Sequence, residues 1–258
     1  MHGGENMVEE NGGNKHNDWK DVFKNFVELV DKAGDFYDIK VFLNDHTEEV
    51  EKTYEWEDDE YTFLHCAAVR GNLELLKELV ENRKVYVDIK TGKKGKTPLL
   101  MAIREGHLEV VKELVNGGAN VHKEDGQGAG ALHYAAMSGQ LEVFKEVATI
   151  VNDAGEYSPK KDKNGFNLLH LAVLSGSEEQ GLESVESSVV LANYILKEYG
   201  TTMLTEETSR GMTPLQLAAN KRNLPMVESF MKHDAFKTIG ADKKYSAIRI
   251  ARKRGPIK

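Results

Sequence analysis

The sequence predicts an all-α fold in which short helix pairs are stacked as repeated units. The phrase Gly-x-Leu-Glu begins at Gly71, Gly106 and Gly139, and a period of roughly 34 residues is typical of stacked repeat proteins. An apolar stripe at three- and four-residue spacing follows each copy, which indicates an amphipathic helix. A second phrase, rich in leucine and alanine, precedes each copy. The predicted unit is therefore two short helices joined at a glycine.

The composition limits the classes of function. Of the 258 residues, 40% are hydrophobic and 29% are charged, which is enough apolar material for a continuous core. No apolar run approaches the roughly 18 residues of a membrane span, so no membrane insertion is expected. A net charge of −8 argues against a nucleic-acid partner. Cys66 is the only cysteine, which fits a reducing, cytoplasmic location.

The N-terminal part is predicted as a tail followed by an end unit. Residues 1–17 are polar and rich in Gly and Asn, without the apolar region of a secretory signal, so a disordered tail is expected. A helix then begins near Asp18, because apolar residues recur on one face over 22–30. A second amphipathic helix covers 36–43. We interpret 18–56 as a degenerate cap unit, since an end repeat buries only one face.

Each later unit begins and turns with residues suited to those positions. Thr97 and Thr213 stand where a helix N-cap belongs, and their hydroxyls accept from an otherwise unpaired backbone N–H. Pro98 and Pro214 follow at the first helical position, which needs no N–H donor. Gly106 allows the tight turn between the paired helices, since a positive φ is easily adopted only by glycine. Each unit is predicted as helix, turn, helix and loop.

One domain at 18–258 is expected. Its predicted units are the cap unit at 18–56, repeats at 57–92, 93–124, 125–161, 162–207 and 208–240, and a C-terminal cap unit at 241–258. The fourth repeat carries an acidic insertion, 177–188, placed between its two helices, and the connection at 152–161 is also long. A tolerated surface insertion is the favoured reading, because longer loops cost little entropy. A functional loop is the alternative.

The unit resembles the ankyrin repeat. The phrases that carry the likeness are Thr-Pro-Leu-Leu-Met-Ala at 97–102, Ala-Leu-His-Tyr-Ala-Ala at 131–136, Leu-Leu-His-Leu-Ala at 168–172 and Gly-Gly-Ala-Asn-Val at 117–121. The resemblance covers about residues 18–258. It implies an ankyrin-repeat solenoid of stacked helix-turn-helix units with β-hairpin-like loops, and a protein that binds other proteins.

Several patterns that could carry chemistry have plainer explanations. The stretch 92–97 places two residues between its glycines where a phosphate-binding loop needs four, so a solvated hairpin tip is favoured. The glycines of 126–130 lack dinucleotide-fold spacing. Cys66 and His65 are adjacent on a helix and face different ways, so they do not form a nucleophile–base pair. Cys66 is expected to be a small packed residue. We predict no catalytic residue and no cofactor.

Histidines recur at one repeat position, at His65, His133 and His170. Helices in neighbouring units pack about 10 Å apart, which is too far for a shared metal whose ligands lie at about 2 Å. No metal site is therefore predicted. The resemblance implies instead that each histidine hydrogen-bonds the backbone of the neighbouring loop.

The resemblance also implies where a partner binds: on the concave face, lined by loop tips and the exposed side of each first helix. The residues placed there are Asp58, Asp59, Tyr61, Val69, Arg70, Lys93, Lys94, Lys96, Arg104, Glu105, Gln127, Met137, Ser138, Lys163, Asn164, Phe166, Leu174, Ser175, Arg210, Met212, Asn220 and Lys221. The first end is acidic, the second unit is basic, and the middle is apolar. Exposed apolar groups are typical of interface hot spots, and flanking charges set orientation. Packing of these apolar groups under their own loops is the alternative.

The leading hypothesis is a monomeric, non-enzymatic scaffold or adaptor that binds a protein or peptide. One alternative is an effector of an intracellular microbe that binds host proteins after delivery by a non-classical route. Another is the substrate-recruiting part of an enzyme, weakened because few residues remain outside the stack for a catalytic domain. The basic run 249–254 is read as the polar end of the last helix rather than as a targeting signal.

Overall fold

The computed structural model describes residues 15–32, 36–56, 59–155, 158–176, 182–233, 236–237, 240–241, 243–244 and 249, and only the backbone of 15–20 and 182. Most of the expected tail at 1–17 and most of the C-terminal cap unit at 241–258 lie outside these residues. The helices are α1 (Lys15–Asp31), α2 (Phe36–Asp45), α3 (Phe63–Arg70), α4 (Leu73–Lys77), α5 (Pro98–Glu105), α6 (Leu108–Asn116), α7 (Ala131–Ser138), α8 (Leu141–Asp153), α9 (Leu168–Ser175), α10 (Leu182–Tyr199), α11 (Pro214–Asn220) and α12 (Leu224–Lys232). A π-helical turn, η1 (Glu78–Asn82), continues α4, and a 3-10 turn, η3 (Thr201–Leu204), follows α10.

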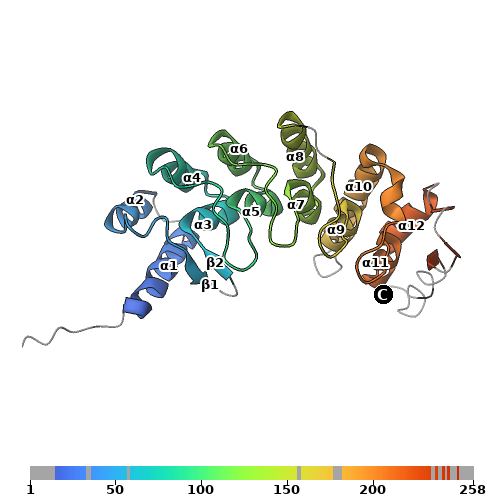
Figure 1. Cartoon of the computed structure of the whole chain (residues 1–258), viewed down its shortest axis with the longest axis horizontal. Coiled ribbons are helices and arrows are strands. Elements are labelled where there is room, and N and C mark those ends of the chain that lie inside the picture. Colours follow the sequence, from blue (N-terminus) through green and yellow to red (C-terminus); the bar gives the residue numbers. More distant parts are fainter. Residues whose placement is uncertain are drawn as a thin grey trace, which may run out of the picture.

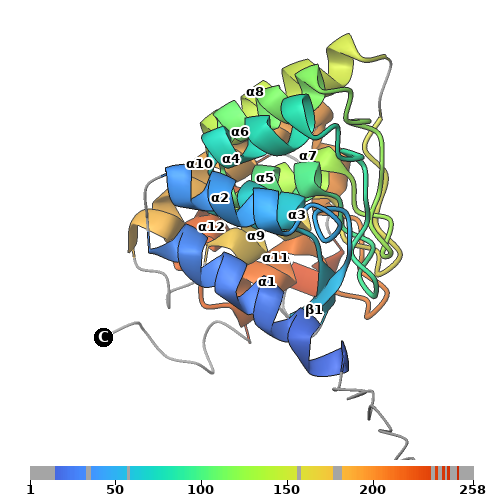
Figure 2. The same cartoon turned by 90° about the vertical axis from the view of Figure 1, so that its left-hand side faces the viewer.

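The helices stand as a row of pairs in chain order (Figure 1). The first helices of the pairs, α3, α5, α7, α9 and α11, each contact the next along the row, and we call them the inner helices. Their partners α4, α6, α8, α10 and α12 form a second layer, and the loops gather along one edge (Figure 2). This arrangement agrees with the predicted all-α repeat fold. The unit boundaries themselves stay a prediction.

The predicted helix starts are confirmed. Thr97 accepts a hydrogen bond from the backbone N–H of Leu100 at 3.3 Å, and Thr213 accepts from that of Gln216 at 3.3 Å. Each is followed by its proline in the first helical turn. The caps at these two helices are thus local, since each is made within three residues of sequence.

The predicted glycine turns are confirmed at Gly71, Gly106 and Gly139, whose φ angles are 65°, 82° and 73°. Gly176 differs, with a φ of −96°. A Cβ added there would lie 2.0 Å from the hydroxyl of Ser188, so this glycine is required by close packing instead. At the corresponding turn of the last pair, Arg222 adopts a φ of 63° without being glycine.

Two boundaries differ from expectation. Helix α1 begins at Lys15 rather than near Asp18. The insertion at 177–188 is not a loop throughout, because α10 begins at Leu182. Val185 and Ser188 are buried one turn apart, which packs this segment against the row. The sequence pattern hid this because the segment is rich in Glu and Ser, while only its sparse inward positions are packed.

Within the described residues there is one short β-hairpin, formed by β1 (Tyr54–Trp56) and β2 (Asp59–Tyr61), with Tyr54 opposite Tyr61. It lies beside α1 and α3 (Figure 1). The ring of Tyr54 stacks on Phe63 at 5.5 Å and on Phe23 at 5.0 Å. Offset aromatic contacts of this kind add to the burial of apolar area. The N-terminal end of the row is thus closed by an aromatic cluster.

The loops between pairs are held internally by a side chain that accepts from their own backbone. Asp125 accepts from the N–H groups of Gln127 and Ala129, at 2.8 and 2.9 Å. Asp162 makes the same two bonds, to Asn164 and Phe166, at 2.9 and 2.7 Å. Such turns fix the loop without a second strand.

Successive loops are also bonded to one another through the backbone. The bonds run from the N–H of Gly126 to the carbonyl of Lys94 at 2.8 Å, from Lys163 to Gln127 at 2.9 Å, and from Ser209 to Asn164 at 2.8 Å. The tips therefore form one connected row along the edge seen in Figure 2.

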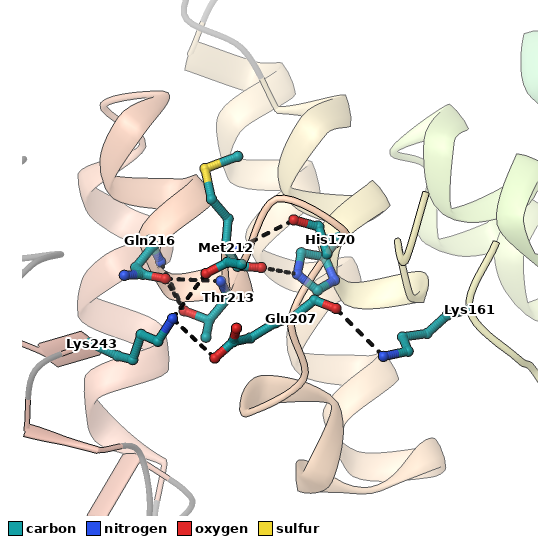
Figure 3. Close-up of polar contacts among 9 residues, drawn as sticks. Lys161, His170, Glu207, Met212, Thr213, Gln216 and Lys243 are labelled. Carbon is teal, nitrogen blue, oxygen red and sulfur yellow. Dashed lines mark hydrogen bonds and ion pairs between the residues drawn. The ribbon is translucent and has the colours of Figure 1, made fainter. Parts of the chain in front are cut away.

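The predicted role of the histidines is confirmed. The Nε2 atoms of His65, His133 and His170 lie 3.1, 2.8 and 3.0 Å from the carbonyl oxygens of Lys96, Lys160 and Met212 in the next loop. Each Nδ1 accepts from the backbone N–H at the start of its own helix, so Nε2 carries the proton and donates. Figure 3 shows the His170 contact.

Burial of these rings disfavours their charged form. It lowers the pKa of His65 and of His170 to about 4, and it lowers the pKa of His133 as well. In the last pair, Gln216 takes the place of the histidine, and its Oε1 accepts from the N–H of Thr213 at 3.0 Å (Figure 3). A neutral amide can therefore cap this position.

The Arg222→Gly substitution is expected to stabilise the protein by about 1 kcal/mol, because a non-glycine residue in the left-handed region is strained. Urea unfolding followed by circular dichroism measures it. The matched control is Lys221→Gly at the preceding position, where φ is −80° and glycine relieves no strain. Equal effects of the two substitutions would contradict the assigned cause.

The double substitution His65→Gln and His170→Gln is expected to flatten the pH dependence of stability. In the unfolded chain each histidine is protonated below about pH 6.5, whereas in the folded chain it stays neutral down to about pH 4. Protonation therefore favours the unfolded state, and stability falls as the pH drops through this window. Each ring contributes a loss on the order of 3 kcal/mol. Unfolding free energies measured from pH 7.5 to 4.5 test this, and an unchanged slope would refute it.

Candidate functional site

The predicted partner-binding residues lie at the loop tips and at the C-terminal ends of the inner helices, and we call this surface the inner face. Ten are exposed: Arg70, Lys93, Lys94, Arg104, Glu105, Gln127, Lys163, Asn164, Arg210 and Lys221. Ten are half-buried: Tyr61, Val69, Lys96, Met137, Ser138, Phe166, Leu174, Ser175, Met212 and Asn220. Asp59 is buried, and Asp58 lies outside the described residues.

Asp59 was wrongly expected to be exposed. Its side chain is only 2% exposed, and its carboxylate accepts from the backbone N–H groups of Lys93 and Lys94, at 2.7 and 3.3 Å. Burial raises the pKa of this carboxyl. These two hydrogen bonds and a third from the backbone N–H of Glu60 outweigh burial, so the pKa lies below its usual range. Asp59 therefore ties the β-hairpin to the next loop.

Other predicted residues are partly engaged within the chain. Arg70 forms a two-bond ion pair with Asp31 of α1, at 2.7 and 3.1 Å. Lys163 donates to the carbonyl of Gly126 at 2.8 Å. The hydroxyls of Ser138 and Ser175 donate to carbonyls of their own helices. These side chains therefore help to hold the inner face in place, and their polar groups are less available to a partner.

The predicted apolar middle is only partly accessible. Met137, Phe166, Leu174 and Met212 are half-buried and pack against the core. The ring of Phe166 meets His170 edge to face at 5.8 Å. Each of these side chains therefore presents one side to the core and keeps another at the surface.

The structure adds a cavity that the sequence did not indicate. A pocket of about 210 Å³ lies at the N-terminal end of the row, and we call it the aromatic pocket. Its lining residues are Phe23, Val27, Trp56, Tyr61, His65, Cys66, Val69, Arg70 and Met101. Helix α1, the β-hairpin, α3 and α5 all contribute, so only the folded chain assembles it.

A second, polar hollow adjoins the pocket. It has a volume of about 450 Å³, and we call it the basic hollow. Its lining residues are Tyr61, Lys94, Lys96, Met101, Arg104, Glu105 and Tyr134. Tyr61 and Met101 line both spaces, so the pocket and the hollow are adjacent, and we call the two together the depression.

Sequence reasoning missed Met101 and Tyr134. They occupy the same place in their units as Cys66, one residue before the first alanine of the inner-helix phrase. That position varies between copies while its neighbours repeat, which is a usable signal. Nothing comparable pointed to Phe23, since its apolar spacing on α1 fits any core position.

The electrostatics of the depression follow from its cations. Burial lowers the pKa of Lys96, and repulsion by Arg104 and Lys94 lowers it further. Burial also raises the pKa of the Cys66 thiol to about 12, so the thiol stays protonated at neutral pH and is a poor nucleophile. The confirmed small packed role of Cys66 agrees with its 6% exposure.

Two classes of site find no support in the part of the chain that the structure describes. Over those residues no group of three or more His, Cys, Asp or Glu side chains is placed to hold a metal ion. Among the described helices, none combines the length and the apolar character needed to cross a membrane.

Comparison with known proteins identifies the repeats. Residues 29–125 match the family model described as ankyrin repeats (3 copies). The E3 ubiquitin-protein ligase KEG of Arabidopsis thaliana is 27% identical over 176 residues, covering 67% of this chain and 10% of the ligase. The probable E3 ubiquitin-protein ligase XBOS31 of Oryza sativa is 40% identical over 90 residues, which is 34% of this chain and 20% of the relative.

A third relative is named as an inhibitor. Human NF-kappa-B inhibitor zeta is 26% identical over 190 residues, covering 66% of this chain and 26% of the relative. The chain thus spans about a quarter or less of each of these proteins. The repeated phrases, the hydrogen-bonded loops and the family match agree that the chain carries ankyrin repeats, matched at residues 29–125.

Proposed function

We propose that the chain is a non-enzymatic scaffold or adaptor whose concave face binds a protein or peptide. The observation that carries the proposal is the inner face: bonded loop tips beside half-buried apolar side chains such as Met137 and Leu174. In this proposal the row of pairs is a solenoid and the inner face is its concave side. Repeat arrays of this kind present extended binding surfaces.

The state of the titratable groups supports binding rather than catalysis. The buried histidines already donate to loop carbonyls, and the thiol of Cys66 is held protonated. The depression is open and is lined mainly by aromatic, aliphatic and cationic side chains. The net charge of −8 further favours a protein partner over nucleic acid. The proposed location is cytoplasmic, because the single cysteine fits a reducing compartment.

A second candidate is the substrate-recruiting part of an enzyme. It is favoured by one observation: two relatives are named as ubiquitin ligases, and this chain spans only 10% and 20% of them. In that case the inner face binds the protein to be modified and the chemistry lies elsewhere. Both candidates assign the same task to this surface.

The pair Met137→Glu and Leu174→Glu is expected to reduce the capture of partner proteins by the immobilised chain at least about tenfold, because charge at a hot spot leaves a desolvated interface unpaired. Quantitative mass spectrometry of the captured proteins measures it. The matched control is Val190→Glu with Met231→Glu, two exposed apolar positions on the outer helices α10 and α12. Circular dichroism checks that both variants fold.

The comparison of the two variants decides the outcome. Loss of the same captured proteins in the inner-face variant alone supports the proposal. Retention in both variants, with folding intact, would show that this part of the inner face is not the binding surface.

A further inference from the structure

We propose that the aromatic pocket and the basic hollow together bind an extended peptide segment in which a bulky apolar side chain stands close to one or two carboxylates. This rests on the proposed function and names the chemistry of the partner. It adds a contact at the N-terminal end of the inner face to the one proposed at its apolar middle.

The aromatic pocket supplies the apolar half. Phe23, Val27 and Cys66 are at most 6% exposed and form its floor. Trp56 is half-buried, and its ring meets Phe23 edge to face at 5.7 Å. Val69 is half-buried too. An aromatic-lined pocket of this volume can desolvate one large side chain, and such anchors dominate peptide affinity.

The basic hollow supplies the charged half through Lys94, Lys96 and Arg104. Between the residues that the structure describes, neither Lys96 nor Arg104 forms an ion pair. These three cations line one hollow, and their repulsion adds to burial in lowering the pKa of Lys96. A carboxylate placed among them would relieve that repulsion, which is the charge complementarity that the proposal uses.

The surroundings limit the size of the anion. Asp59 and Asp125 act on Lys96 with the opposite sign to its cationic neighbours, and Glu105 lines the same hollow. A cluster of three cations bounded by carboxylates suits one or two acidic side chains. A long polyanion would be repelled by these surrounding carboxylates and by the negative net charge of the chain.

The two halves are adjacent because Tyr61 and Met101 line both. An extended strand advances about 3.3 Å per residue, so neighbouring or next-but-one side chains of a peptide can reach the two spaces at once. The segment is therefore expected to carry its apolar anchor and its carboxylates within about three residues.

The test is a selection from a displayed library of random, unmodified peptides against the full chain. Enriched peptides are expected to pair a large apolar residue with Asp or Glu within about three positions. Affinities of synthesised peptides are then measured by calorimetry for the wild type, for Arg104→Glu and for the matched control Lys221→Glu. Lys221 is exposed on the same face at the far end of the row.

The expected result is a loss of affinity of at least about tenfold for Arg104→Glu and little change for Lys221→Glu. Peptides with the acid changed to its amide, or with the anchor changed to alanine, should weaken similarly. A direct reporter is available, since Trp19 and Trp56 are the only tryptophans. In a Trp19→Phe background, the emission of Trp56 should change as peptide is added.

Other outcomes overturn the inference in distinguishable ways. One such outcome is a set of peptides without the pairing, whose affinity is unchanged by Arg104→Glu but is lost with Met137→Glu/Leu174→Glu. It would overturn the inference while leaving the proposed function intact. Peptides that leave the Trp56 emission unchanged would also place binding elsewhere. Both proposals would be overturned if no peptide were enriched and if Met137→Glu/Leu174→Glu and Val190→Glu/Met231→Glu both still captured the same proteins as the wild type.

Discussion

The bond on which the rest of the structure depends runs from an inner-helix side chain to the backbone of the next loop. His65, His133 and His170 each accept from their own helix start and donate to a carbonyl one unit further along. One neutral ring thereby satisfies two buried backbone groups, which would otherwise be costly to leave unpaired. The bond fixes both the distance between units and the position of each loop.

A row braced in this way separates stability from recognition. The loop backbones are held by Asp125 and Asp162 and by backbone bonds between successive tips, so exposed tip side chains such as those of Lys93 and Arg210 are not needed to hold them. The buried rings are neutral at physiological pH, and the charges that vary between units stand at the surface. Substitution at the tips can therefore alter what is bound without loosening the row.

The features that could be predicted from the sequence are those set by residues close together in the chain or by a position in the repeat. The cap at Thr97, the turn at Gly106 and the small packed Cys66 each follow from a few neighbouring residues, or from a repeated place in the unit. Asp59 was misplaced because it stands in an acidic run typical of a solvated surface. Only the folded chain shows that the next loop donates two N–H groups to it. The helical part of the insertion was hidden for the same reason, since Val185 and Ser188 reveal their burial only in contact with the row.

The depression lies at the end of the row, where the regular repeat stops. Between identical units each inner helix meets its neighbour in the same way, so their faces form an even surface. At the N-terminal end α1 takes the place of a regular inner helix, and the β-hairpin brings Trp56 and Tyr61 beside it. The mismatch between α1 and the regular pairs leaves a space that side chains line without filling. A binding site thus arises where the repeat breaks down, and no single repeated phrase could have indicated it, because its walls come from four elements that are regular only when considered one at a time.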